Sequence, residues 1–105
     1  MTVANEKTDT GTRLDWQTAV RSDRRIGNAA FRFASYVAHR FNAKKGKAYF
    51  SDETAGEELN MKRSTLGRCR KELQDAGYLT FRPGRGMLAT EYVLVHDRVS
   101  GMLDM

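Results

Sequence analysis

SDETAGEELNMKRSTLGRCRKELQDAGYL, residues 51–79, is the stretch of sequence that decides the expected fold. Its first part favours a short helix, because Ser51 can cap a helix start and Asp52 and Glu53 then occupy the first turn, where negative charge is favoured. Asn60 follows where a tight turn needs a residue that tolerates positive φ. The pattern therefore predicts a short helix, a tight turn and a second helix.

The second helix is expected from Arg63 to Ala76, and its two faces differ in polarity. Its apolar stripe consists of Leu66, Cys69, Leu73 and Ala76. Its polar face consists of Ser64, Arg68 and Lys71, with Thr65 and Glu72 at the edge. Such a charged face usually only meets solvent, but the turn before it and the hairpin after it favour DNA, whose major groove admits an α-helix. Gly77 suits the left-handed conformation that often follows a helix.

A β-hairpin is predicted directly after this helix. Residues 78–82 and 90–95 alternate between apolar and polar, and the turn cluster Pro83-Gly84-Arg85-Gly86 separates them. The side chains expected to face the helices are Leu79, Phe81, Tyr92 and Leu94. Arg82 and Arg85 would then point outward, toward DNA phosphates or a minor groove. The alternative is an ordinary hairpin with a solubilising arginine. Residues 49–50 can add a short third strand.

The chain before this motif divides into a tail and two expected helices. Residues 1–12 are polar and aperiodic, which predicts a disordered tail. Residues 14–21 predict a short amphipathic helix that contains Trp16. A long helix is expected from Arg24 to Asn42, with Ser22 or Asp23 as its cap and an apolar stripe that fills the core. Trp16 has two open interpretations, packing within the chain or contact with a second subunit across an exposed apolar surface.

The segment from about Trp16 to Val95 resembles winged helix-turn-helix DNA-binding domains, more narrowly those of bacterial phage- and plasmid-borne regulators and replication proteins. The residues that carry the likeness are Trp16, Ala19-Val20, Asp23-Arg24-Arg25, Phe41-Asn42, Phe50-Ser51, Ala55, Leu59, Arg63-Ser64-Thr65-Leu66, Lys71-Glu72-Leu73, Ala76-Gly77-Tyr78-Leu79 and Tyr92-x-Leu94. The general match is specific, whereas the narrower one rests on motifs that mostly concern folding. The resemblance implies a mainly α fold with a small β-hairpin: a three-helix core plus a two- or three-stranded wing.

Two positions depart from the family pattern. Asn60 stands where the family usually has glycine, and Arg70 stands where it often has leucine or isoleucine. Because an unpaired buried charge is costly, we expect Arg70 to pair with a carboxylate of the preceding helix, namely Asp52, Glu53 or Glu57. This pairing makes Arg70 a doubtful DNA contact and leaves the fold unaffected.

Composition agrees with a small DNA-binding domain. The chain has 105 residues and a net charge of +5, and its basic residues lie in blocks on either side of the acidic segment 49–60. The lone cysteine, Cys69, allows no intrachain disulfide, and His39 and His96 belong to no ligand or catalytic pattern. We therefore expect no enzyme activity, no cofactor, no metal site and no evident small-molecule ligand. The absence of a long apolar run argues against a membrane partner and predicts a cytoplasmic protein.

The sequence thus predicts a sequence-specific protein that binds double-stranded DNA, most simply a transcriptional regulator of a mobile element or chromosomal promoter. The winged domain is expected over residues 13–98, with a C-terminal tail at 99–105. Helix 63–76 would enter the major groove, and the wing at 82–87 would lie on the backbone or minor groove. The expected DNA-binding residues are Lys62, Arg63, Ser64, Thr65, Arg68, Lys71, Arg82 and Arg85. The alternatives are an origin-binding replication initiation protein and a protein-interaction module, and the Trp16 region is a candidate homodimer contact.

Overall fold

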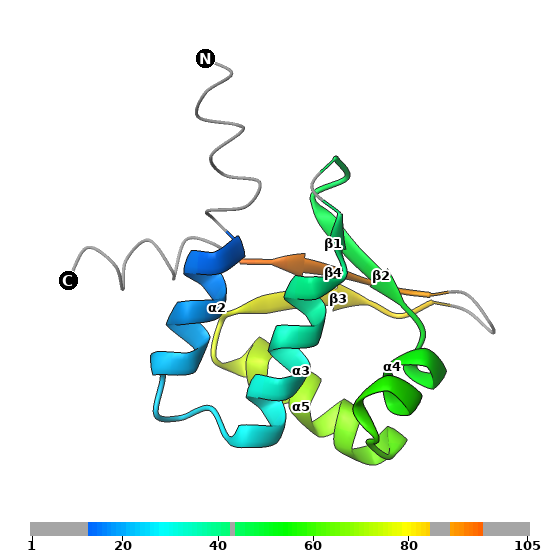
Figure 1. The fold of residues 1–105 in the computed structure, drawn as a ribbon, viewed down its shortest axis with the longest axis horizontal. Coiled ribbons are helices and arrows are strands. Elements are labelled where there is room, and N and C mark those ends of the chain that lie inside the picture. Colours follow the sequence, from blue (N-terminus) through cyan, green and yellow to red (C-terminus); the bar gives the residue numbers. More distant parts are fainter. Residues whose placement is uncertain (1–12, 43, 85–88, 96–105) are drawn as a thin grey trace.

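The structure is a computed structural model and describes residues 13–42, 44–84 and 89–95. These residues form a small α/β domain of four helices and one four-stranded antiparallel sheet, with more residues in helices than in strands (Figure 1). The elements in chain order are α2 (Arg13–Ser22), α3 (Asn28–His39), β1 (Phe41–Asn42), β2 (Lys47–Phe50), α4 (Asp52–Leu59), α5 (Arg63–Asp75), β3 (Leu79–Arg82) and β4 (Thr90–Leu94). The expectations for both tails and for Arg85 concern residues outside the described ranges.

The sheet has the strand order β1-β2-β4-β3, so β4 lies between two strands that are far apart in sequence. Phe50 pairs with Thr90, and Leu79 pairs with Leu94. The helices are gathered below the sheet in Figure 1, with α3 crossing next to it. Since successive side chains of a strand point to opposite faces, one face of the sheet is buried under these helices, and no described helix covers the other, which we call the open face.

Aromatic side chains fill the space between α3 and the sheet. The rings of Phe50 and Tyr92 stack with centroids 4.5 Å apart, and Phe33 and Tyr36 of α3 meet the Phe50 ring edge-on. Such offset and edge-to-face pairs add to the stabilisation from buried apolar area. The side chains that were expected to face the helices do so, since Leu79, Tyr92 and Leu94 are buried and Phe81 packs on the core.

Trp16 is buried within its own chain. It has no exposed surface, and its indole Nε1 donates a hydrogen bond to the Tyr78 carbonyl oxygen at 2.7 Å. The Tyr78 hydroxyl in turn donates to the Asp23 carboxylate at 2.8 Å. Hydrogen bonds from Arg25 hold the pKa of Asp23 well below its usual range. Because this network ties α2 to the turn before β3, the expectation of an exposed apolar surface at Trp16 is wrong.

Helix α3 is shorter than the helix expected from Arg24 to Asn42. Asp23 accepts hydrogen bonds from the backbone N–H groups of Arg25 and Ile26, so the chain turns before the helix begins. Gly27, rather than Ser22 or Asp23, is the N-cap residue. At the other end Phe41 and Asn42 pair with Ala48 and Lys47 in the sheet. The expected helix is therefore shortened at its start by the turn that the Asp23 side chain stabilises and at its end by strand pairing, although the local pattern favours a helix at both ends.

The local signals around the α4–α5 turn are confirmed. Ser51 accepts a hydrogen bond from the Thr54 N–H at 3.1 Å, and Asn60 adopts the left-handed conformation with φ 55°. A Cβ on Gly56 would lie 3.0 Å from the Met61 carbonyl oxygen, so the close approach that needs a glycine falls four residues before Asn60. The third strand at residues 49–50 is confirmed as part of β2, whereas the fourth strand, β1, was not predicted.

Candidate nucleic-acid interface

The outward face of α5 carries most of the residues that were expected to contact DNA. The inward stripe of Leu66, Cys69 and Leu73 is buried against the rest of the domain, so side chains on the opposite side of the helix point to solvent. Ser64, Arg68 and Lys71 are exposed on that side, and Thr65 is half-buried at its edge. The exposed residues Lys62 and Arg63 stand at the start of the helix. These residues therefore form one continuous polar surface, the α5 surface.

The cations of the α5 surface differ in their partners. Lys71 pairs with Asp75 at 3.0 Å, one turn along the helix, and both side chains are exposed. A surface pair of this kind contributes little because water and salt screen it. Within the described residues no carboxylate lies in ion-pairing distance of Lys62, Arg63 or Arg68. These three side chains can therefore meet an anionic ligand without first breaking an ion pair to a described residue.

Gly67 is a residue of the α5 surface that sequence reasoning missed. It lies in the middle of α5, where glycine destabilises a helix by about 0.5–1 kcal/mol relative to alanine. A Cβ built at Gly67 would have no heavy atom within 4 Å, apart from its own helix backbone and chain neighbours. Packing within the described part of the domain therefore does not require glycine here. A glycine on an exposed helix face permits a ligand to approach the backbone closely, and this was the available sequence signal.

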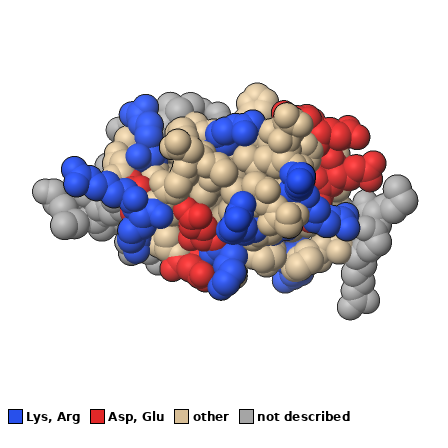
Figure 2. All heavy atoms as spheres, turned by 90° about the horizontal axis from the view of Figure 1, so that it is seen from below, with Lys and Arg blue, Asp and Glu red and all other residues tan. Residues whose placement is uncertain are grey.

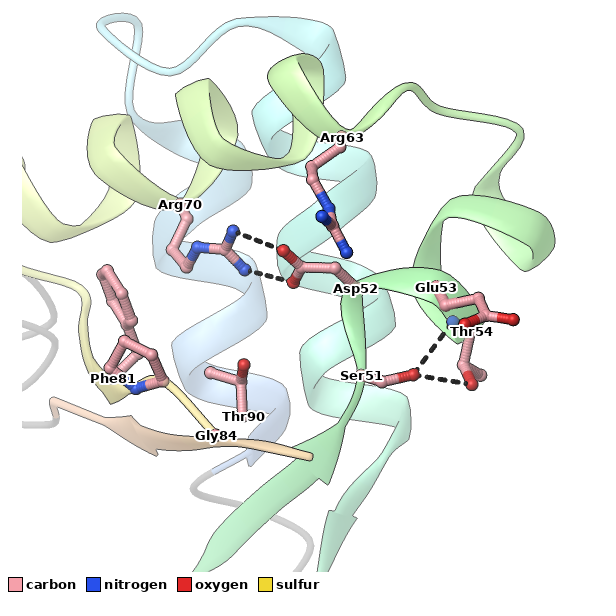
Figure 3. A pocket seen from close by; sticks show the side chains of 10 residues that line it. Ser51, Asp52, Glu53, Thr54, Arg63, Arg70, Phe81, Gly84 and Thr90 are labelled. Atoms are coloured by element: carbon pink, nitrogen blue, oxygen red, sulfur yellow. Dashed lines mark hydrogen bonds and ion pairs between the residues drawn. The ribbon is translucent and has the colours of Figure 1, made fainter. Parts of the chain in front are cut away.

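A hollow of about 510 Å³ lies beside the start of α5, between α4 and the β3–β4 hairpin. Arg63 and Arg70 line it from α5, Ser51 and Asp52 from the start of α4, and Phe81 from β3 (Figure 3). In Figure 3 Arg63 points from the first turn of α5 toward Asp52. The hollow is therefore a polar recess at the border of the α5 surface.

Arg70 holds this recess together and is not part of the outward face. Its guanidinium donates to both Asp52 oxygens, at 2.8 and 3.2 Å (Figure 3). It also donates to the Tyr92 hydroxyl at 2.6 Å. It also lies over the Phe81 ring, 5.2 Å from the centroid. Burial raises the pKa of Tyr92 to about 12. The expected partner in the preceding helix is confirmed as Asp52.

Glu72 and Arg32 also join elements around α5. The Glu72 carboxylate accepts a hydrogen bond at 2.7 Å from the backbone N–H of Gly27, the N-cap of α3. Arg32 of α3 donates at 2.6 Å to the Leu59 carbonyl oxygen at the end of α4. Sequence reasoning placed Glu72 only at the edge of the polar face. These contacts orient α4 and α5 against α3, and thus set the direction in which the α5 surface points.

Arg82 does not join the α5 surface. It is exposed on β3, opposite Glu91 in the strand register, on the face of the sheet that the helices leave open. Lys47 lowers the pKa of Glu91 through an ion pair at 2.8 Å, and Arg82 lowers it further by its charge. The outward orientation expected for Arg82 is therefore confirmed, but its neighbours are sheet residues. Arg85, the other expected wing arginine, lies outside the described residues.

The charge on the side of α4 and α5 is mixed. Figure 2 views this side from below: Lys and Arg spread across most of it, and the largest group of carboxylates gathers at the end where Figure 1 places α4. The acidic residues of α4 are Asp52, Glu53, Glu57 and Glu58. A ligand with negative charge is therefore favoured over α5 and disfavoured over the exposed part of α4.

Comparison with known proteins assigns no family. No family model matches the chain, and no curated protein sequence matches it significantly. Within the described ranges, no cluster of three or more His, Cys, Asp or Glu residues is arranged to hold a metal ion. The helices of these ranges are too short or too polar to cross a bilayer.

Proposed function

We propose that this protein binds duplex DNA in a sequence-dependent manner, with α5 in the major groove, and acts as a transcriptional regulator. The observation that carries the proposal is the α5 surface. Three cations without an ion pair to a described residue, two hydroxyls and a glycine with open space beside its Cα lie there on one short helix. Arg pairs with guanine edges, Ser and Thr adapt to several bases, and Lys and Arg bind phosphates. This function places the protein in the cytoplasm with the DNA.

The arrangement of the elements supports a winged helix-turn-helix fold for this purpose. Two short helices joined by the turn at Asn60–Lys62 are followed by the β3–β4 hairpin, which is the order that the family resemblance implies. In the proposed complex Ser64, Thr65 and Arg68 read base edges. Lys62, Arg63 and Lys71 bind phosphates, and the recess beside Arg63 faces the adjoining backbone. The wing role of Arg85 remains part of this proposal, whereas Arg82, which lies opposite Glu91 on the open face of the sheet, is not assigned to the duplex.

The experiment that tests the proposal is selection from a genomic DNA library with the purified protein at low and high salt. A shared sequence motif, with affinity that falls as salt rises, is the expected result. Location of the motif at promoters supports a regulator, and location at a replication origin supports the initiator alternative. Absence of binding at low salt contradicts the proposal and favours a protein-interaction module.

Replacing Arg68 and Lys71 separately should divide base reading from backbone binding. Arg68→Ala should weaken binding to the selected sequence about 5- to 150-fold and to unrelated sequences much less, because a good bidentate base contact contributes ~1–3 kcal/mol of discrimination. Lys71→Ala should weaken binding to all sequences alike. It should also reduce the slope of the logarithm of affinity against the logarithm of salt concentration by about one unit. Affinity titrations of both variants on specific and scrambled duplexes measure the two effects. Equal, small effects at both positions would contradict this division of roles.

Gly67→Ala should change stability and DNA affinity in opposite directions. The added methyl meets no described neighbour, so the helix should gain about 0.5–1 kcal/mol. The same methyl should obstruct close approach of the duplex and weaken binding. Urea unfolding and duplex titration measure the pair of effects, with Gln74→Ala, an exposed change near the end of α5, as the matched control. Unchanged duplex affinity in Gly67→Ala would rule out close contact at this position.

A further inference from the structure

The open face of the sheet carries an aromatic side chain surrounded by cations. Tyr49 of β2 is the one large hydrophobic side chain that is exposed among the described residues, at 36%. Its neighbours in the strand, Ala48 and Phe50, are buried on the other face, so Tyr49 points away from the helices. Glu91 stands opposite Tyr49, and Arg82 stands opposite Glu91, which places all three in one row across the sheet.

The β1–β2 turn adds two lysines, Lys44 and Lys45, beside this surface. Figure 1 shows the β1–β2 hairpin reaching beyond the other two strands. The Asn42 side chain accepts hydrogen bonds from the backbone N–H groups of Lys44 and Lys45, and Gly46 supplies the positive φ of the turn, 68°. The Lys45 ammonium lies over the Tyr49 ring, 5.4 Å from its centroid. The turn geometry thus holds Lys45 against the ring and places exposed Lys44 next to it in the chain.

The net charge of this surface is positive. Lys44, Lys45, Lys47 and Arg82 supply its cations, and Glu91, paired with Lys47 at 2.8 Å, is its carboxylate among the described residues. An exposed aromatic ring with cations near it on a sheet face offers a stacking partner for a base and ligands for the phosphates on either side of it. A duplex keeps its bases stacked and paired, so a sheet-mounted ring favours a single strand.

We propose that the open sheet face binds single-stranded nucleic acid, with one base stacked on Tyr49 and adjacent phosphates held by Lys44, Lys45 and Arg82. This surface is separate from the α5 surface, because Tyr49 and Arg82 point away from the helices whereas α5 lies among them. The inference goes beyond duplex binding: one domain would hold a duplex on α5 and a separated strand on the sheet. On entry of a base, the Lys45 ammonium moves from the ring face to a phosphate.

The test is fluorescence anisotropy with a labelled oligothymidine of about 12 nucleotides, within the ~4–16 nucleotide range of known single-strand sites. Tyr49→Ala should weaken binding about five-fold or more, and Tyr49→Phe, which keeps the ring, should bind like the parent. Tyr49→Thr serves as a second variant, because threonine favours strands and keeps the sheet intact. Lys44→Ala should weaken binding and lower its salt dependence.

Matched variants on α5 separate this proposal from duplex binding. Lys62→Ala removes the same charge from the α5 surface and should leave oligothymidine affinity near that of the parent. An unlabelled duplex should leave the oligothymidine bound, since the two surfaces differ. Unchanged affinity in both Tyr49→Ala and Tyr49→Thr, with normal circular dichroism, would overturn the proposal. An equal loss of oligothymidine affinity in Lys62→Ala would also overturn it, because the strand would then lie on α5. Displacement of the oligothymidine by polyglutamate as effective as by unlabelled oligothymidine would overturn it too, because the surface would then bind acidic protein. If the parent protein binds oligothymidine but no duplex, the proposed duplex function fails and the single-strand proposal stands.

Discussion

Replacing Trp16 with alanine is expected to lower the free energy of unfolding by about 3–5 kcal/mol, the usual cost of removing a buried aromatic side chain. Trp16 has no exposed surface and contributes both its ring and its hydrogen bond to Tyr78. The loss is large for a domain of this size, because total stabilities are about 5–15 kcal/mol. Urea unfolding should be followed by circular dichroism, since Trp16 is the only tryptophan and its fluorescence disappears with the substitution.

Trp16→Phe is the control for this result. It keeps much of the buried apolar volume but removes the hydrogen bond to the Tyr78 carbonyl oxygen and part of the ring system, so it should cost less than Trp16→Ala. A loss below about 1 kcal/mol in Trp16→Ala would show that α2 does not pack on the domain in solution. Light scattering on the folded Trp16→Phe protein should give the parent mass. A mass below that of the parent would indicate that Trp16 contacts a second subunit, which its burial within the chain argues against.

Arg70→Ala is expected to lower the free energy of unfolding by about 2–3 kcal/mol, because it leaves the Asp52 carboxylate without its partner in a partly desolvated site. The Arg70 side chain is 11% exposed and that of Asp52 is 23% exposed, so water can only partly replace the lost hydrogen bonds. The Tyr92 hydroxyl loses a donor in the same change. Urea unfolding of Arg70→Ala, Asp52→Asn and the double variant measures the coupling between the two side chains.

Arg70→Leu distinguishes the ion pair from the packing of the side chain. Leucine fills the space over Phe81 but leaves Asp52 unpaired, so this variant should still be less stable than the parent. Adding Asp52→Asn to Arg70→Leu should recover part of the loss, since no unpaired charge then remains. If Arg70→Leu alone is as stable as the parent or more stable, the ion pair is not needed for folding.

Short-range patterns in the sequence predicted the part of the molecule that carries the candidate site. The Ser51 cap, the left-handed Asn60 and the stripe of Leu66, Cys69 and Leu73 each depend on neighbours within a few residues. Helix periodicity also decides which side chains of α5 face outward, so Ser64, Arg68 and Lys71 could be placed on one surface in advance. The partner of Arg70 was within reach for the same reason, since α4 is adjacent in sequence and in space.

Interactions that helical periodicity does not record decided what the sequence patterns missed. The α3 boundaries follow from the Asp23 turn and from the pairing of residues 41–42 with 47–48, which compete with helix formation. Arg82 lies apart from the α5 surface because the register of β3 on β4 turns it to the open face of the sheet. The importance of Gly67 could be inferred only once the structure showed that a Cβ there would meet no neighbouring atom of the described residues.

By itself the sequence determined the two short helices joined by a tight turn and the polar face of α5, because capping, turn conformation and helical periodicity act over a few residues. Only the tertiary structure decided that Trp16 is buried within the chain, that β1 exists and that Tyr49 and Arg82 share an open sheet face. The burial of Trp16 and the pairing of β2 with β4 depend on residues tens of positions apart. The pairing of β1 with β2 and of β3 with β4 depends on residues that face each other across a turn. The energies of these interactions can outweigh a local preference, which amounts to at most about 1 kcal/mol for an ordinary residue.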